Sequence, residues 1–213
     1  MDDEVLGCGG TIARHVSQGD EVVVCVVANR AYDHKYDTGR IDEEKASAEK
    51  ARKHLGYQRL IFLDLPDEKL DSGIQEIIIP LEEVYREVAP EIVYICHHGD
   101  INQDHRAVFE ASMVVLRPHS GNKPRRVLSY EVPSSTDQAF PIQGAAFQPN
   151  FYVDISEQLI QKLAALGDYE VELRQYPHPR SPEGIDIYAK KRGIEIGMKA
   201  AEAFVVFRDE WPS

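Results

Sequence analysis

Two polar segments of the sequence carry side chains that could do chemistry together. The first is Asp2-Asp3-Glu4, and the second runs from Asp100 to His105. Adjacent carboxylates repel one another, so a compact fold keeps them together only beside something positive. The first segment lies at a junction between a loop and a predicted helix, and the second lies between an apolar strand and an apolar helix. Two such junctions can meet at one edge of a sheet, and carboxylates with a histidine are typical of a metal site.

The elements that must position these segments alternate between strands and helices. Apolar runs predict strands over 21–28, 60–63, 92–96, 127–132, 151–155 and 203–207. Helical patterns cover 12–16, 41–55, 74–88 and 107–116, another from a Ser156 cap to Leu166, and a last one that opens with Ser181-Pro182-Glu183. Continuous apolar runs favour buried parallel strands. We expect an α/β fold with three Rossmann-like layers, a mostly parallel sheet and helices on both faces, as one domain over 1–213.

Composition excludes several classes of protein. The net charge of −12 argues against binding to nucleic acid or to an anionic membrane surface. No apolar stretch reaches the length of a membrane span, and the charged opening is unlike a signal peptide. Cys8, Cys25 and Cys96 form no C-x-x-C pair, which predicts reduced cysteines in a cytoplasmic protein. A homo-oligomer stays open as an alternative to a monomer.

Ligands of open parallel sheets bind beyond the carboxyl ends of the strands. The segment 97–105 is expected there, and Asp2 and Asp3 would lie there if a strand precedes them. A mixed set of histidine and carboxylates with one open position suits a hydrolytic Zn²⁺ ion. A spare carboxylate beside it can act as general base.

At these residues the sequence resembles the zinc-dependent sugar N-deacetylases, the family of LmbE-like proteins and of PIG-L, the glycosylphosphatidylinositol-precursor de-N-acetylase. The resemblance is nearly full-length. It rests on the Asp-Asp-Glu-Val-Leu-Gly-x-Gly-Gly opening, the Asp-His-Arg-Ala-Val element over 104–108, the Pro-His-Pro-Arg-Ser stretch over 177–181 and the segment 199–204. The first two motifs are specific to the family, and the last two are supportive.

The resemblance implies a role for each matching residue. Asp2 would be the general base, and Asp3 and His105 would be zinc ligands. Asn102 stands where many members have a histidine that helps to stabilise the tetrahedral intermediate, and an amide cannot carry positive charge. That electrostatic role would then fall to His178 or Arg180, and Asn102 and Arg180 would contact substrate.

The family pattern also has a histidine ligand two residues before Asp2, and a strand that leads into it. Neither is present in the sequence, which would leave an unpaired edge or an apolar gap beside 22–27. We therefore expect the native reading frame to extend upstream, with a short apolar strand ending in a histidine.

Several residues have a plainer interpretation beside the functional one. His105 could face solvent in a first helical turn, Asp2 and Asp3 could be ordinary N-terminal acids, and Asp104 could serve the start of a helix. His97 and His98 point to opposite faces if extended, so only one would meet the site, and His98 is the candidate for substrate contact. The glycines of 7–10 favour close packing over phosphate binding. The segment 29–40 could be a lid or an ordinary loop.

Three functions follow in order of support. The first is a cytosolic Zn²⁺-dependent deacetylase that removes acetyl from an N-acetylated amino sugar or its conjugate, a small-molecule substrate. In it, water attacks the acetamide carbonyl, Asp2 takes its proton and Asp2 then protonates the leaving amine. The second is a catalytically silent, truncated relative that binds only sugar or metal. The third, a nucleotide-dependent enzyme, is disfavoured because no G-x-G-x-x-G is present.

Overall fold

The computed structural model describes residues 1–29, 39–119, 123–140, 142 and 144–211. Its strands are β1 (Val23–Asn29), β2 (Arg59–Pro66), β3 (Ile92–Cys96), β4 (Arg126–Tyr130), β5 (Phe151–Asp154) and β6 (Ala201–Asp209). Its helices are α1 (Asp3–Ser17), α2 (Gly39–Leu55), α3 (Ile74–Val88), α4 (Gln103–Val115), α5 (Leu159–Gly167) and α6 (Pro182–Ile196). Two short 3₁₀ turns cover Leu70–Ser72 and Thr136–Gln138.

The strands form two sheets in the described part of the chain. β1 pairs with β2 in parallel, and the other sheet has the order β3-β4-β6-β5. β3 and β4 are parallel, whereas β6 runs antiparallel to both of its neighbours. The predicted α/β class with mostly parallel strands is confirmed, and the closing strand is the exception in direction.

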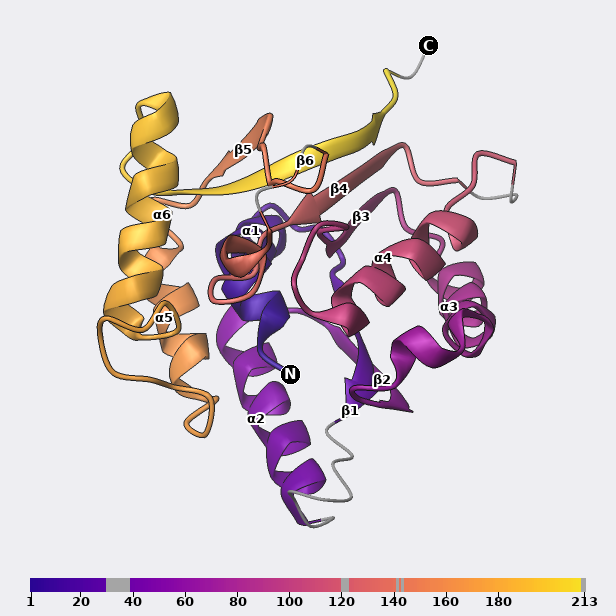
Figure 1. The fold of residues 1–213 in the computed structure, drawn as a ribbon. Helices are drawn as coiled ribbons and strands as arrows, with labels where there is room; N and C mark the ends of the chain where they lie inside the picture. Colours follow the sequence, from indigo (N-terminus) through magenta and orange to yellow (C-terminus); the bar gives the residue numbers. More distant parts are fainter. Residues whose placement is uncertain (30–38, 120–122, 141, 143, 212–213) are drawn as a thin grey trace.

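Helices cover both faces of the strands (Figure 1). On β4, Leu128 is buried with residues of α1, α2 and α5, whereas its neighbour Val127 is buried beside Phe109 and Met113 of α4. Successive strand residues point to opposite faces, so α1, α2 and α5 form one layer and α4 lies in the other. α3 joins α4 through Ile77, which packs against Ala107 and Ala111.

The first helix differs from its prediction because it contains the glycines. α1 begins at Asp3, with Asp2 as its N-cap residue, rather than after the glycines. A Cβ on Gly7 would lie 2.3 Å from Cδ2 of Tyr130, and one on Gly10 would lie 2.7 Å from Cβ of Ile155. Glycine therefore lets α1 approach the sheet closely, which confirms the packing interpretation of this segment.

The predicted starts of α4 and α5 were also wrong. α4 begins at Gln103 rather than at residue 107, because the side chain of Asn102 accepts a hydrogen bond from the backbone N–H of Asp104 and caps it. α5 begins at Leu159, since Asp154 accepts bonds from both the N–H and the hydroxyl of Ser156 and so holds it in a turn. The predicted Ser181 cap of α6 is confirmed.

The expected gap beside residues 22–27 is present in the structure. Among the described residues, β1 pairs only with β2 and β3 only with β4, and a cavity of about 1050 Å³ lies between β1 and β3. Most of the segment 29–40 lies outside the described residues. No helix in the described ranges combines the length and the apolar character needed to cross a membrane.

Candidate functional site

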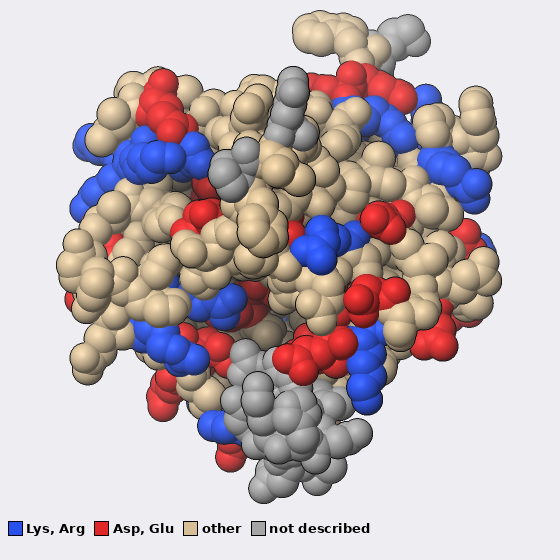
Figure 2. Space-filling view, in the orientation of Figure 1, with Lys and Arg blue, Asp and Glu red and all other residues tan. Residues whose placement is uncertain are grey.

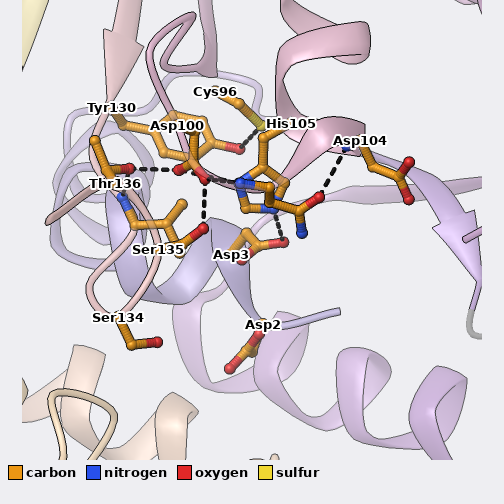
Figure 3. A network of polar contacts seen from close by, with 12 residues as sticks. Asp2, Asp3, Cys96, Asp100, Asp104, His105, Tyr130, Ser134, Ser135 and Thr136 are labelled. Atoms are coloured by element: carbon orange, nitrogen blue, oxygen red, sulfur yellow. Dashed lines mark hydrogen bonds and ion pairs between the residues drawn. The ribbon is translucent and has the colours of Figure 1, made fainter. Parts of the chain in front are cut away.

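The carboxylate of Asp3 faces the imidazole of His105 at the carboxyl end of β3 (Figure 3). Oδ2 of Asp3 lies 3.4 Å from Nε2 of His105. Asp3 stands in the first turn of α1 and His105 in the first turn of α4, so both helix starts converge here. The structure therefore brings together the two residues that were expected to share a site.

Asp100 holds the other side of the His105 ring. Its Oδ2 lies 3.2 Å from Nδ1 of His105, and its side chain is fully buried. Ser135 donates a hydrogen bond to Oδ1, and Thr136 donates one of 2.6 Å to Oδ2. The backbone N–H of Asn102 also donates to Oδ1, at 2.8 Å. Asp100 is thus locked from several directions and fixes the orientation of His105.

The proximity of opposite charges shifts the titration of this group of side chains. Burial alone raises the pKa of Asp3, but the charge and hydrogen bond of His105 outweigh it and hold that pKa far below its usual range. Burial lowers the pKa of His105, yet Asp3 and Asp100 raise it well above its ordinary value. The pKa of Asp100 is lowered, because bonds from His105, Ser135 and Thr136 exceed the effect of burial.

Asp2 belongs to a second cluster, centred on Arg180. Nη1 of Arg180 lies 3.3 Å from each oxygen of Asp2 and 3.6 Å from Glu172, and its Nε donates to the hydroxyl of Ser134 at 2.8 Å. In Figure 3 the carboxylate of Asp2 points away from His105. Burial raises the pKa of Asp2, although the N-terminal ammonium group and Arg180 act in the opposite direction.

Asn102 and Asp104 have structural contacts at the start of α4. Asn102 caps the helix through its side-chain oxygen and also lines the cavity between β1 and β3. Asp104 accepts hydrogen bonds from the backbone N–H groups of Glu68 and Leu70, which ties the loop after β2 to α4. Burial, together with Asp67, raises the pKa of Asp104 to about 6.

Three further histidines, His97, His98 and His178, make contacts of their own apart from the Asp3–His105 pair. Nε2 of His98 is 2.6 Å from the carbonyl of Gly144, and its ring packs against Phe109 and Phe207. His97 is buried, 3.3 Å from Ser129. His178 is exposed, and its Nδ1 accepts a hydrogen bond from the backbone N–H of Arg180.

Sequence reasoning missed the residues that contact Asp100 and Arg180 from other segments of the chain. Ser135 and Thr136 follow β4 in a stretch without periodicity, and Glu172 lies beyond α5. Each reaches the site only through the tertiary fold, so no local pattern marks it. Glu172 stands out in the structure because it is a charged residue that is nevertheless buried.

The donor atoms fit two positions of a zinc site. Zinc takes nitrogen and oxygen ligands at ~2.0–2.1 Å, so two of its ligands in tetrahedral geometry lie about 3.4 Å apart. Asp3 and His105 have this separation. Within the described ranges no group of three or more His, Cys, Asp or Glu side chains converges on one point.

Comparison with known proteins identifies the family. Residues 1–116 match the model of PIG-L, GlcNAc-PI de-N-acetylase. The chain is 33% identical over 177 residues to the uncharacterized deacetylase YaiS of Escherichia coli K12, which covers 79% of this chain and 85% of the relative. The chain belongs to the PIG-L family. It is thereby a member of a family of deacetylases.

Solved structures share the fold of this PIG-L member at low sequence identity. N,N'-diacetylchitobiose deacetylase from Pyrococcus horikoshii superposes with a TM-score of 0.77 at 18% identity, over 97% of this chain and 80% of that one. GalB, a 4-carboxy-2-hydroxymuconate hydratase from Pseudomonas putida KT2440, has a TM-score of 0.77 at 21% identity, over 100% and 94% of the two chains. The fold therefore serves more than one reaction.

Charge on the face shown in Figure 2 is mixed. Acidic and basic side chains are interspersed over it, without one continuous basic area. The chain as a whole carries a net charge of −12.

Proposed function

We propose that this PIG-L member is a hydrolase that removes the acetyl group from an N-acetylated amino sugar or its conjugate, with a Zn²⁺ ion as cofactor. The observation that carries this proposal is the Asp3–His105 pair, with Asp2 beside it on the same helix start. The family membership and the sugar deacetylase among the solved structures support the substrate class. The three free cysteines support a cytoplasmic location.

Asp3 and His105 would hold the ion together with one further ligand. When bound, Zn²⁺ lowers the pKa of water and polarises the acetamide carbonyl. Asp100 keeps the ring of His105 in position. Asp2 takes a proton from the attacking water, and its raised pKa suits a base that must later release that proton. The protonated Asp2 then passes the proton to the leaving amine.

Arg180 and Asn102 would contact the substrate. Both line the cavity, and the Asp3–His105 pair belongs to the same lining, at the carboxyl end of β3. The guanidinium of Arg180 can donate to a sugar hydroxyl or to developing negative charge. His178 lies two residues away, exposed, and we propose it as a secondary contributor to the same charge stabilisation. His98 packs outside this cavity lining and would reach substrate only with a change of conformation.

Metal content and amine release test the proposal together. Asp2→Asn should leave zinc bound and reduce deacetylation of N-acetylated amino sugars by roughly 10²–10⁴-fold, because one residue serves as base and acid. Asp3→Ala and His105→Ala should lower zinc content instead. Asp186→Asn, on the exposed face of α6, is the control and should change neither. Loss of metal in Asp2→Asn with full metal in Asp3→Ala would reverse the two roles.

A catalytically silent binding protein is the second candidate, and one observation favours it. The described residues bring only two donors to the point where a catalytic zinc needs three protein ligands. Under this alternative the chain binds metal weakly, and amino sugars bind without release of acetate. Calorimetric titration with zinc and with an N-acetylated amino sugar, alongside an acetate assay, separates the two functions.

A further inference from the structure

The turn after β4 reaches both clusters of the site. Ser134 accepts a hydrogen bond of 2.8 Å from Nε of Arg180. The next two residues, Ser135 and Thr136, instead donate to the two carboxylate oxygens of Asp100. Figure 3 shows these two residues beside Asp100, whereas Ser134 lies well below them in the view. We call the three consecutive residues the hydroxyl turn.

The backbone of Ser134 lets these neighbouring hydroxyl groups point in different directions. Its φ of 72° lies in the left-handed region, which serine rarely adopts. The carbonyl of Val132 closes the turn, because it accepts hydrogen bonds of 3.0 and 2.9 Å from the N–H groups of Ser135 and Thr136. A residue outside its preferred backbone region is held there by its surroundings, and such residues gather at functional sites. The conformation of Ser134 therefore marks the turn as a candidate for a role in the site.

The hydroxyl group of Thr136 has a fixed direction. It accepts a hydrogen bond of 2.8 Å from the backbone N–H of Val132, and it lies 2.6 Å from Oδ2 of Asp100. A hydroxyl group has a single proton to donate. Because the N–H of Val132 can only donate, the proton of Thr136 points at Asp100. Thr136 thus joins the backbone of the turn to the carboxylate that the turn holds.

Asp100 connects this turn to His105. The carboxylate is fully buried, and its Oδ2 lies 3.2 Å from Nδ1 of His105. This contact keeps Nδ1 turned toward Asp100 and leaves Nε2 directed at Asp3, 3.4 Å away. Metal-binding histidines are commonly oriented by an outer carboxylate in this way. Ser135 and Thr136 therefore act on the orientation of the His105 ring, although neither of them touches it.

Ser134 acts in a similar way on Arg180. Nη1 of Arg180 lies 3.3 Å from Asp2 and 3.6 Å from Glu172, which is longer than usual for an N–H···O hydrogen bond. The bond from Nε to Ser134 is the shortest of these contacts, and both residues line the cavity. The guanidinium group is planar and rigid, so a bond to Nε also sets the direction of its other N–H groups.

We propose that the three residues of the hydroxyl turn are positioning residues of the site. The last two residues of the turn orient the zinc ligand His105 through Asp100. Ser134 orients the guanidinium group of Arg180 toward the substrate. One turn thereby fixes the metal-binding half and the substrate-binding half of the site relative to each other. These roles rest on the proposed function, which makes His105 a zinc ligand and Arg180 a substrate contact.

Single substitutions in the full chain test the two halves separately. Ser135→Ala removes a hydroxyl group that bonds to Asp100, and it should weaken zinc binding by roughly 10-fold in calorimetric titration. By NMR, the exchange of the Nε proton of Arg180 with water should stay unchanged. Ser134→Gly removes the acceptor of that proton, and glycine adopts the left-handed backbone without strain. It should speed the exchange by roughly 10-fold, lower kcat/KM for an N-acetylated amino sugar by a similar factor and leave zinc affinity unchanged.

Substitutions of Thr136 test the link between the two halves. Thr136→Val keeps the shape of the side chain but removes its bonds to Asp100 and to the N–H of Val132. It should change both zinc affinity and proton exchange at Arg180, because the turn itself loosens. Thr136→Ser restores the hydroxyl group and should return both measurements to the values of the parent chain. Ser17→Ala removes an exposed hydroxyl group at the end of α1, and as the control it should change neither.

Three results would overturn the proposal. In the first, Ser135→Ala binds zinc as tightly as Ser17→Ala does. In the second, Ser134→Gly leaves proton exchange at Arg180 unchanged. In the third, Ser134→Gly and Ser135→Ala each change both measurements by equal factors, as expected of a turn with only a structural role. Zinc affinity and proton exchange do not depend on turnover. A parent chain that releases no acetate would thus refute the proposed deacetylase, while these two measurements still decide the roles of the turn.

Discussion

The ammonium group of Lys162 lies 2.6 Å from Oε1 of Glu202, and both side chains are only 4% exposed. This ion pair is built into the packing of α1. Lys162 donates a hydrogen bond to the carbonyl of Leu6, and the backbone N–H groups of Gly10 and Thr11 donate to the two oxygens of Glu202. In a regular helix the Leu6 carbonyl and the Gly10 N–H would bond to each other. The pair therefore ties the helix that carries Asp2 and Asp3 to α5 and β6.

Glu202→Gln should destabilise the protein by about 2–4 kcal/mol, because it leaves the buried ammonium group of Lys162 without its counter-charge. Urea denaturation followed by circular dichroism measures the change. Asp186→Asn is the matched control, since it breaks the exposed Lys190–Asp186 pair and should cost less than ~1 kcal/mol. Equal losses of unfolding free energy in the two variants would show that the buried ion pair contributes no more to stability than the exposed pair does.

Gly10→Ala should destabilise the protein by about 1–3 kcal/mol, although alanine is the better helix former. The added Cβ would lie 2.7 Å from the side chain of Ile155, which is fully buried. Gly167→Ala at the end of α5 is the control, because a Cβ there meets nothing within 4 Å. Thermal unfolding should show a lower Tm for the first variant and an unchanged or higher Tm for the second.

Gly10 also shows where sequence reasoning fails and where it succeeds. The bounds of α3 and β3 were predicted from local signals, a helical hydrophobic pattern for α3 and a continuous apolar run for β3. The start of α1 could not be predicted, since glycine is a poor helix former and its use here depends on Ile155, far away in the sequence. Local patterns carry no information on such an approach of two elements.

In the site, too, local patterns predicted some features, whereas others depend on the tertiary fold. Asp3 and His105 were expected to meet because each belongs to a segment at a helix start, and the structure brings them within 3.4 Å. The contacts of Asp100 with Ser135 and Thr136 could not be foreseen, because they join segments through an irregular loop. The grouping of Asp2 with Arg180 and Glu172 also depends on the tertiary fold.

Arg180→Gln should raise the pKa of Asp2 further, since the nearby positive charge that opposes burial is removed. The carboxyl ¹³C chemical shift of Asp2, followed by NMR across the acid range with a chelator present, measures this directly. Arg174→Gln is the control, because Arg174 is about half exposed and lies 3.9 Å from Glu172. A titration of Asp2 that is the same in both variants would mean that Arg180 does not control this carboxylate.

The last prediction concerns Glu4, whose pKa is raised to about 7 because burial disfavours its charged form. Tyr169 donates a hydrogen bond of 2.6 Å to its Oε1, which opposes that shift. An acid whose pKa is higher in the folded state binds more protons there than in the unfolded chain. Its contribution to the free energy of unfolding therefore falls as pH rises from about 4.5 to about 7 and stays low above that range.

Glu4→Gln should remove this dependence, because glutamine has no proton to lose. At pH 8 the variant should be more stable than the parent chain by about 3 kcal/mol, because each unit of the rise in the pKa of Glu4 is worth ~1.4 kcal/mol, and at pH 4.5 the two should be nearly equal. Urea unfolding at several pH values, with EDTA present, gives both curves. Glu170 is a nearby exposed carboxylate, and the free energy of unfolding of Glu170→Gln should depend on pH as that of the parent chain does. If the free energy of unfolding of Glu4→Gln also follows that of the parent chain between pH 4.5 and 8, the carboxyl of Glu4 does not titrate in that range.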